Sequence, residues 1–212
     1  MPMIKVVPFI FEGVDELYAN TYLLIDSDNN CVVIDPAKEY PGIVNYIKKN
    51  ELNLKAVLLT HGHVDHMRGT DILVDEFNAP LYIGFDDEDK LSDTYANVSY
   101  LLGENLIIKS KANTIADNEV LHLINEDIKV IAVPYHTAGS VCFYLKGSGI
   151  LFTGDFIIMH SVGRSDLPSA KPRELANSMA KVLALPDSTK IYGGHGASST
   201  LEMERRLNPF VK

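Results

Sequence analysis

The amino-acid sequence predicts an α/β protein built from two β-sheets with helices on their outer faces. Short apolar runs rich in branched side chains recur through both halves of the chain, as expected of strands. Stretches in which apolar residues have helical spacing separate these runs in each half. The chain has 212 residues, of which 46% are hydrophobic and 22% charged, so one large folded domain over residues 1–212 is expected.

The first half alternates predicted strands with two predicted helices. The strands are expected at residues 4–11, 21–26, 31–35, 54–59 and 81–83. A helix over residues 41–50 is indicated by Ile43, Val44 and Ile47, which fall on one face. A second helix is expected over residues 67–77. The run at 54–59 is apolar throughout, which suits a strand buried on both faces.

The second half is predicted to contain the second sheet. Residues 86–118 are polar and weakly patterned, and we expect a short helix and a long surface excursion there. Strands are expected at residues 119–124, 129–133, 141–145, 150–153 and 190–193. The clearest late helix covers residues 172–185, with Pro172 at a first-turn position, and a short helix follows around residues 201–207.

The acidic composition narrows the classes of partner. The chain has 19 Lys and Arg residues against 28 Asp and Glu residues, a formal net charge of −9. A nucleic-acid binder normally has a basic face, and a protein docked on an anionic membrane has basic clusters. We therefore expect neither partner. Cys31 and Cys142 lie in apolar strand contexts and are expected to be buried, unreactive thiols.

No targeting segment is recognisable in the sequence. Pro8 interrupts the first apolar run and acidic residues follow it, which does not match a secretory signal. No window approaches the roughly 18 consecutive apolar residues of a membrane span. A cytoplasmic location is therefore expected.

The strongest chemical signal is the segment His61-Gly62-His63-Val64-Asp65-His66, directly after the strand predicted at residues 54–59. Imidazole nitrogens and carboxylate oxygens bind divalent metals at about 2.0–2.2 Å. Residues i and i+2 project to the same side of an extended chain, so His61 and His63 can point at one ion. Asp65 and His66 then point to a neighbouring position, which invites a second ion. The alternative is a polar loop that caps the following helix, with Asp65 as its N-terminal charge.

Three further residues are candidates to complete such a site. His136, Asp155 and His195 each follow a predicted apolar strand and lie near glycine, where the backbone can turn sharply. Each alone would more often be an ordinary surface or core residue. Their shared context favours a common role, whereas His122 and His160 lack that context.

The order of these motifs resembles the metallo-β-lactamase-fold hydrolase superfamily. The motifs are H-x-H-x-D-H, then the His of H-T-A-G-S, the Asp of T-G-D and the His of G-H-G. Residues 163–168 (G-R-S-D-L-P) and 204–210 (E-R-R-L-N-P-F) are similar to its bacterial glyoxalase II-like (hydroxyacylglutathione hydrolase-like) branch. The resemblance runs over about residues 21–210. It implies a four-layer αββα sandwich, with two mixed β-sheets, helices on the outer faces and a site at one edge between the sheets.

The resemblance also implies a role for each candidate residue. A first metal ion would be held by His61, His63 and His136, a second by Asp65, His66 and His195, and Asp155 would bridge both. Asp35 resembles the buried aspartate of the superfamily and would orient the ligand loop; the alternative is an ordinary turn residue at a strand end. Arg164 lies where the branch places substrate contacts and could hold a substrate carboxylate; the alternative is a solvated surface arginine.

Two departures from the family pattern bear on the substrate. Ala138 and Ala197 stand where the family usually has proline, which changes loop rigidity and leaves the ligands intact. Full-length glyoxalase II also has a C-terminal helical domain that helps to grip glutathione. This chain is expected to be a single metallo-β-lactamase-like domain of residues 1–212, without such a helical domain. The natural substrate is therefore left open.

The expected function is hydrolysis of a thioester or ester, with S-acylglutathione or a related acyl-thiol as the small-molecule partner. Two divalent ions, zinc by preference and iron or manganese as options, would share a bridging hydroxide that attacks the carbonyl carbon. Asp65 is expected to orient that hydroxide as well as to bind metal.

Three other functions are compatible with the residues. An iron-dependent persulfide dioxygenase would use one iron held mainly by His61, His136 and Asp155, because imidazole and carboxylate suit iron and zinc alike. Another metallo-hydrolase, such as a lactonase, would use the same centre, while the net charge of −9 disfavours a nuclease-type phosphodiesterase. The third is a non-enzymatic binding module. The oligomeric state is left open.

Overall fold

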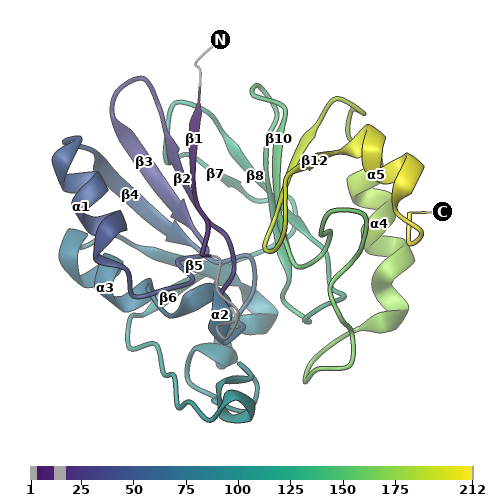
Figure 1. Cartoon of the computed structure of the whole chain (residues 1–212), viewed down its shortest axis with the longest axis horizontal. Helices are drawn as coiled ribbons and strands as arrows, with labels where there is room; N and C mark the ends of the chain where they lie inside the picture. Colours follow the sequence, from purple (N-terminus) through teal and green to yellow (C-terminus); the bar gives the residue numbers. More distant parts are fainter. Residues whose placement is uncertain (1–3, 12–17, 212) are drawn as a thin grey trace.

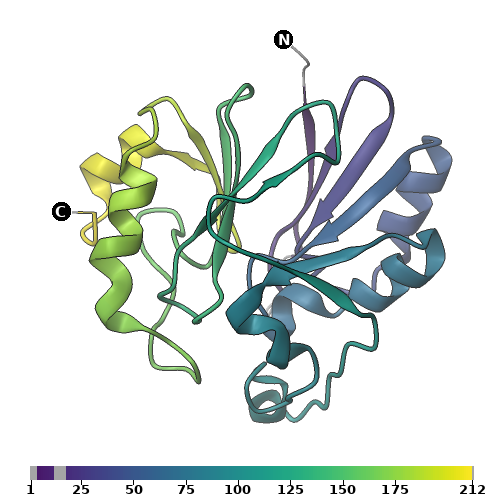
Figure 2. The same ribbon diagram turned by 180° about the vertical axis from the view of Figure 1, so that it is seen from behind.

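The computed structural model describes residues 4–11 and 18–211. They form two six-stranded β-sheets packed face to face, with helices on both outer faces (Figure 1). The helices α1 (Pro41–Lys49) and α3 (Thr70–Phe77) cover the first sheet, and α4 (Leu175–Leu183) and α5 (Leu201–Leu207) cover the second. Figure 2 shows the same four layers from behind and confirms the expected αββα sandwich. No helix in the described ranges is long and apolar enough to span a membrane.

Both sheets are mixed, as expected. The first has the order β1-β2-β3-β4-β5-β6, with strands Lys5–Phe9, Thr21–Ile25, Asn30–Ile34, Asn53–Leu58, Leu81–Gly84 and Ala112–Ile115. Its first three strands pair antiparallel, and β3 to β6 pair parallel. The second sheet has the order β12-β11-β10-β9-β8-β7. Its strands β7 to β12 are Val120–Leu121, Ile128–Ala132, Val141–Leu145, Ile150–Gly154, Lys190–Gly193 and Ser199–Thr200, and β10 and β11 pair parallel.

Side chains alternate along the central strands between separate apolar layers. Leu24, Val32 and Phe143 belong to the layer between the two sheets. Leu23 and Val33, one residue along, pack instead with the buried faces of α1 and α3. Because both faces of these strands are buried, their sequences are continuously apolar. The two cysteines are free and buried, as expected.

The helix predicted at residues 67–77 is wrong in its boundaries. The short helix α2 (Val64–Met67) begins earlier, and a break at Gly69 separates it from α3. The Gly69 N–H donates to the Pro36 carbonyl at 2.7 Å, and a Cβ at Gly69 would lie 2.3 Å from the Lys38 carbonyl oxygen. This close backbone approach separates the helices. Periodicity cannot reveal it, because the contacting loop lies some 30 residues earlier.

The interpretation of residues 86–118 as a surface excursion is also wrong in part. The strand β6 pairs parallel with β5 at the edge of the first sheet. The same stretch contains the 3₁₀ helix η2 (Ser99–Leu102) and most of η1 (Phe85–Leu91). Four-residue β6 and two-residue β12 are too short for an apolar alternation to stand out. The strand expected at residues 119–124 is shorter in the structure, where only the two residues of β7 are in a strand.

The central layer is expected to dominate the stability of the sandwich. Phe143 is fully buried there, so Phe143→Ala is expected to lower the free energy of unfolding by about 3–5 kcal/mol through lost contacts and a cavity. Phe85→Ala is the control: Phe85 is 66% exposed, and a change within about 0.5 kcal/mol is expected. Denaturant unfolding followed by circular dichroism measures both. Equal effects would contradict this account of the core.

Candidate metal centre

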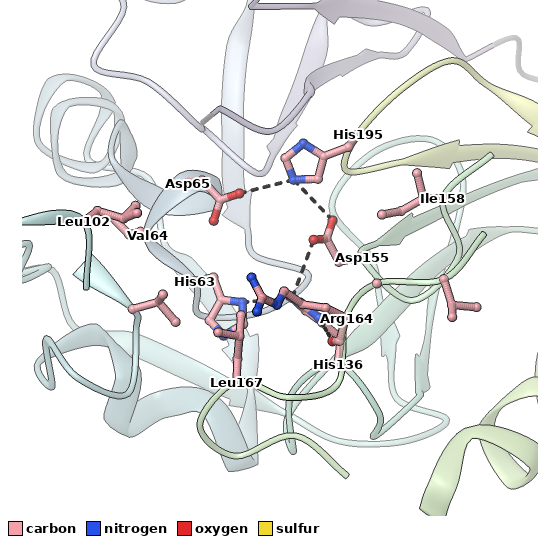
Figure 3. A pocket seen from close by; sticks show the side chains of 13 residues that line it. His63, Val64, Asp65, Leu102, His136, Asp155, Ile158, Arg164, Leu167 and His195 are labelled. Atoms are coloured by element: carbon pink, nitrogen blue, oxygen red, sulfur yellow. Dashed lines mark hydrogen bonds and ion pairs between the residues drawn. The ribbon is translucent and has the colours of Figure 1, made fainter. Parts of the chain in front are cut away.

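Strand ends from both sheets meet at one edge of the sandwich. β4 leads into residues 61–66 from the first sheet, and the loops after β8, β10 and β11 come from the second. The Val141 N–H donates to the Thr60 carbonyl at 2.8 Å and joins the two sheets beside this edge. The structure brings together all seven candidate ligands: His61, His63, Asp65, His66, His136, Asp155 and His195. Figure 3 shows Asp65, Asp155 and His195 directed at one another.

The seven side chains include two groups that could each hold an ion. Their members are His61, His63 and His136 in the first group and Asp65, His66 and His195 in the second, with ligand atoms within 4.8 Å of one another in each. His63 Nδ1 lies 2.9 Å from His136 Nε2, and His195 Nε2 lies 3.2 Å from Asp65 Oδ2. Two ligands of one tetrahedral zinc ion lie about 3.3 Å apart. These spacings therefore suit ligands that share an ion.

Asp155 faces both groups with different oxygen atoms. Its Oδ2 lies 3.5 Å from His136 Nε2 in the first group. Its Oδ1 lies 3.4 Å from His66 Nε2 and 3.6 Å from His195 Nε2 in the second. A carboxylate in this position can contribute one oxygen to each of two neighbouring ions.

Hydrogen bonds fix which imidazole nitrogen faces the centre. His66 Nδ1 donates to Asp35 Oδ2 at 2.9 Å, and His136 Nδ1 donates to the Arg164 carbonyl at 2.6 Å. Carboxylate and carbonyl oxygens only accept, so Nδ1 carries a proton and Nε2 is the nitrogen that would bind a metal ion once it is deprotonated. An imidazole held in this way is oriented for metal binding.

The hydrogen bonding of His61 indicates that a cation fits the centre. Its side chain is buried, and its Nδ1 lies 3.2 Å from Thr60 Oγ1, whose hydroxyl donates to Asp35. Its Nε2 has no hydrogen-bond partner within the part of the chain that the structure describes. A buried polar atom left unpaired costs free energy, which a cation between the two groups would recover. Five imidazoles and two carboxylates therefore fit divalent metals such as zinc or iron.

Asp35 contacts the ligand loop at two places. Its Oδ1 accepts from Thr60 N at 2.8 Å, and its Oδ2 accepts from Thr60 Oγ1 at 2.7 Å and from His66 Nδ1. The residue has a φ of 50°, a left-handed conformation that Asp tolerates better than most residues. A role in orienting the ligand loop requires such contacts. Its effect on metal binding stays a prediction.

Burial and neighbouring charges both shift the pKa values of the side chains in the centre. Burial alone would lower the pKa of His66, but the surrounding carboxylates, Asp35 foremost, outweigh burial and raise it well above its usual value. Burial and then His136 lower the pKa of His63 to about 3. Burial would raise the pKa of Asp155, but the neighbouring histidines, His66 foremost, together outweigh burial and lower it. The ionised carboxylates make the centre a favourable place for cations.

Asp87 was not predicted from the sequence, yet it connects the two loops that carry the first group. It lies in η1 and is fully buried. Its Oδ2 accepts from Gly62 N at 2.9 Å and from Thr137 Oγ1 at 2.7 Å, and its Oδ1 accepts from Gly139 N at 2.8 Å. Lys90 Nζ, also buried, lies 3.0 Å from Oδ1 and balances the charge. The sequence signal is weak, because Asp87 lies in an acidic run typical of an exposed surface.

The remaining candidates lie around or outside the centre. Arg164 lines the cavity next to the ligands, but its Nε and Nη2 donate to the Asp166 carboxylate at 2.6 and 2.7 Å. His122 is exposed and lies outside the cluster. His160 also lies outside it, and its backbone N–H donates to the buried Glu204.

The fold and this set of side chains together define a class of protein. A family model described as the metallo-beta-lactamase superfamily matches residues 14–195. Because the match covers most of the chain, the chain belongs to the metallo-β-lactamase superfamily. The resemblance inferred from the motifs is thereby confirmed.

Individual relatives cover nearly the whole chain. The probable metallo-hydrolase YqgX of Bacillus subtilis is 32% identical over 200 residues, 93% of this chain and 94% of the relative. Hydroxyacylglutathione hydrolase GloC of Haemophilus influenzae is 31% identical over 198 residues, 91% of this chain and 92% of the relative. These names agree on metal-dependent hydrolysis as the general class.

Solved structures with this fold include two that are at least 30% identical to this chain. The BLEG-1 B3 metallo-β-lactamase has a TM-score of 0.89 at 31% identity and covers 99% of both chains. TTHA1623, solved in a di-iron-bound form, has a TM-score of 0.83 at 30% identity and covers 95% of this chain and 100% of its own. The names of the similar proteins differ in substrate, so the substrate of this chain has to be argued from its own residues.

Asp87→Asn is expected to weaken zinc binding by about 10- to 100-fold. An amide cannot accept all of the hydrogen bonds that Asp87 receives from Gly62, Thr137 and Gly139, so the ligand loops would be held less tightly. Calorimetric titration of the metal-free protein measures the affinity. Asp71→Asn is the control, since Asp71 also accepts from Ser110 N and Oγ but belongs to neither metal group. We expect its zinc affinity to be unchanged. A folded Asp87→Asn protein with normal zinc affinity would contradict the positioning role.

Proposed function

We propose that the protein is a metal-dependent thioester hydrolase. The observation that carries the proposal is the lining of the ≈ 330 Å³ cavity beside the two metal groups. Ligand residues from both groups line it, and among the described residues its lining includes no Ser, Thr, Cys, Lys or Tyr. Asp and His side chains can also act as covalent nucleophiles, but every Asp and His of this lining belongs to a group of candidate metal ligands. A water molecule is therefore the nucleophile that this lining supports.

In this proposal the seven side chains would hold two divalent ions. His61, His63 and His136 would hold one, Asp65, His66 and His195 the other, and Asp155 would contribute to both. Bound there, the ions would make hydroxide available near neutral pH by lowering the pKa of water, and would polarise the substrate carbonyl. Zinc is the proposed metal. The di-iron form of TTHA1623 supports iron as the main alternative, and manganese is a further one.

Asp65 is the proposed catalytic residue. Its buried carboxylate lines the cavity and lies 3.2 Å from His195. Burial would raise its pKa, but His66 and His195 outweigh burial and lower it, so the carboxylate is ionised at neutral pH. It can therefore accept a hydrogen bond from the attacking water and orient it. The water oxygen bonds to the carbonyl carbon, the C–S bond breaks, and the thiolate leaves and takes up a proton.

A thioester suits this lining better than an amide. A thiolate departs without prior protonation, whereas an amide nitrogen needs a proton donor in place. The similarity to hydroxyacylglutathione hydrolase GloC supports the same choice. The proposed partner is accordingly a small-molecule thioester, with no nucleic-acid or membrane partner, and the proposed location is the cytoplasm.

A persulfide dioxygenase that uses one iron ion is the second candidate, because imidazole and carboxylate ligands suit iron as well as zinc. This enzyme would consume oxygen in the presence of glutathione persulfide, and a hydrolase would not. Oxygen uptake therefore separates the two. A lactonase-like hydrolase would share the water chemistry and would be recognised by faster turnover of lactones than of thioesters.

Metal analysis combined with a thioester assay tests the proposal. Protein from a metal-replete host is expected to contain close to two divalent ions per chain and to hydrolyse S-lactoylglutathione or a simpler thioester. Asp65→Ala is expected to lower kcat/KM by at least about 100-fold, since it removes both a metal ligand and the group that orients water. Asp127→Ala, at a 69% exposed side chain, is the control. Full activity of an Asp65→Ala protein that retains little metal would contradict the scheme.

A further inference from the structure

The cavity beside the metal groups has apolar walls that the hydrolytic step does not use. Its lining includes Val64, Val98, Leu102, Ile158, Val162 and Leu167. Val64 and Leu102 lie to one side of the ligand side chains and Ile158 to the other (Figure 3). A substrate whose carbonyl reached the ligands would therefore have apolar side chains on either side of it.

One residue of this wall is held in a costly backbone conformation. Val98 has a φ of 71°, which β-branched residues rarely adopt. The preceding Asn97 is fully buried and enforces the turn: its Nδ2 donates to the Lys90 and Leu106 carbonyls at 2.9 and 3.0 Å, and its Oδ1 accepts from Ser99 N at 2.9 Å. Strain that the surrounding structure maintains in this way is typical of functional sites.

The strained turn is attached directly to the metal centre. The Asn97 carbonyl accepts from Val64 N at 2.9 Å, and Val64 precedes the catalytic Asp65. This bond fixes the segment with Val98 and Leu102 against the start of α2. Leu102 is 45% exposed, so the lining of the cavity presents apolar surface to solvent. Exposed apolar surface at a binding site favours an apolar ligand, which would cover it.

The cavity offers few cationic side chains that could bind a carboxylate of the substrate. Arg164 is the one Lys or Arg among its described lining residues, and Asp166 accepts both of its donated hydrogen bonds. Glutathione carries carboxylates, which would find no unpaired guanidinium or ammonium group in this cavity.

We infer that the site selects thioesters with a neutral, apolar acyl chain, and that Val98 and Leu102 are specificity-determining residues that contact this chain. The inference rests on the proposed thioester hydrolysis and adds the class of substrate. It follows from the apolar lining, the maintained strain at Val98 and the paired state of Arg164.

A chain-length series tests it on the metal-loaded protein. Acetyl, butyryl and hexanoyl thioesters of N-acetylcysteamine, a small neutral thiol, are compared with the same acyl groups on glutathione. We expect kcat/KM to rise by about fourfold for each methylene that the cavity buries. The neutral thioesters are expected to be hydrolysed at least as fast as the glutathione thioesters.

Substitutions in the apolar wall of the cavity test whether its side chains cause the preference for longer acyl chains. Leu102→Ala is expected to lower the ratio of hexanoyl to acetyl kcat/KM by about tenfold, because it removes apolar contacts with the chain. Val98→Gly is expected to lower the same ratio while raising the melting temperature, since glycine adopts a positive φ without strain. Leu101→Ala, at the exposed neighbour that does not line the cavity, is the matched control and should leave the ratio unchanged.

Binding of an unreactive analogue separates this inference from the proposed function. The hexyl thioether of N-acetylcysteamine is expected to bind more tightly than the methyl thioether, and less tightly to Leu102→Ala than to Leu101→Ala. If it does so but no thioester is hydrolysed, the proposed function fails and the apolar site stands. If thioesters are hydrolysed with no dependence on chain length, or glutathione thioesters are preferred tenfold or more, the inference is overturned.

Discussion

The metal centre depends on how the two sheets are held together at Thr60. Its carbonyl accepts from Val141 in the second sheet, and its N–H and hydroxyl donate to Asp35 at the end of a strand in the first. The approach is so close that a Cβ at Gly154 would lie 2.2 Å from Thr60 Oγ1. His61 follows Thr60 directly. Any shift of one sheet across the other would therefore change the distances between ligands that come from both.

The sequence allows prediction of whatever depends on local patterns. The four strand ends carry their ligands within a few residues of an apolar run, so the seven candidates could be found without the fold. Asp87 could not, because its burial depends on Gly62 and Thr137, which lie 25 and 50 residues away. The break at Gly69 and the short strand β6 likewise depend on partners distant in sequence. Local propensity says nothing about such partners.

The proposed catalytic chemistry and the proposed substrate choice depend on largely different parts of this molecule. The candidate ligands lie at the ends of strands and in a short helix anchored by both sheets. Apart from Val64 in that helix, the apolar wall comes from the turn at Val98, from η2 and from the segment that includes Ile158 and Leu167. Loops can change while a scaffold stays constant. Such a division would allow proteins of this fold to differ in substrate while they keep the same scaffold.

The seven candidate ligands are unequally shielded from solvent. His195 has a side chain that is 26% exposed, while Asp155 is 11% exposed and the other five are more deeply buried. Exchange of a bound ion with solvent starts where a ligand can swing away and water can enter. The position shared by Asp65, His66 and His195 is consequently the one that a chelator would empty first. A metal ion held there would exchange with free metal ions in solution more quickly than an ion held by the three buried histidines.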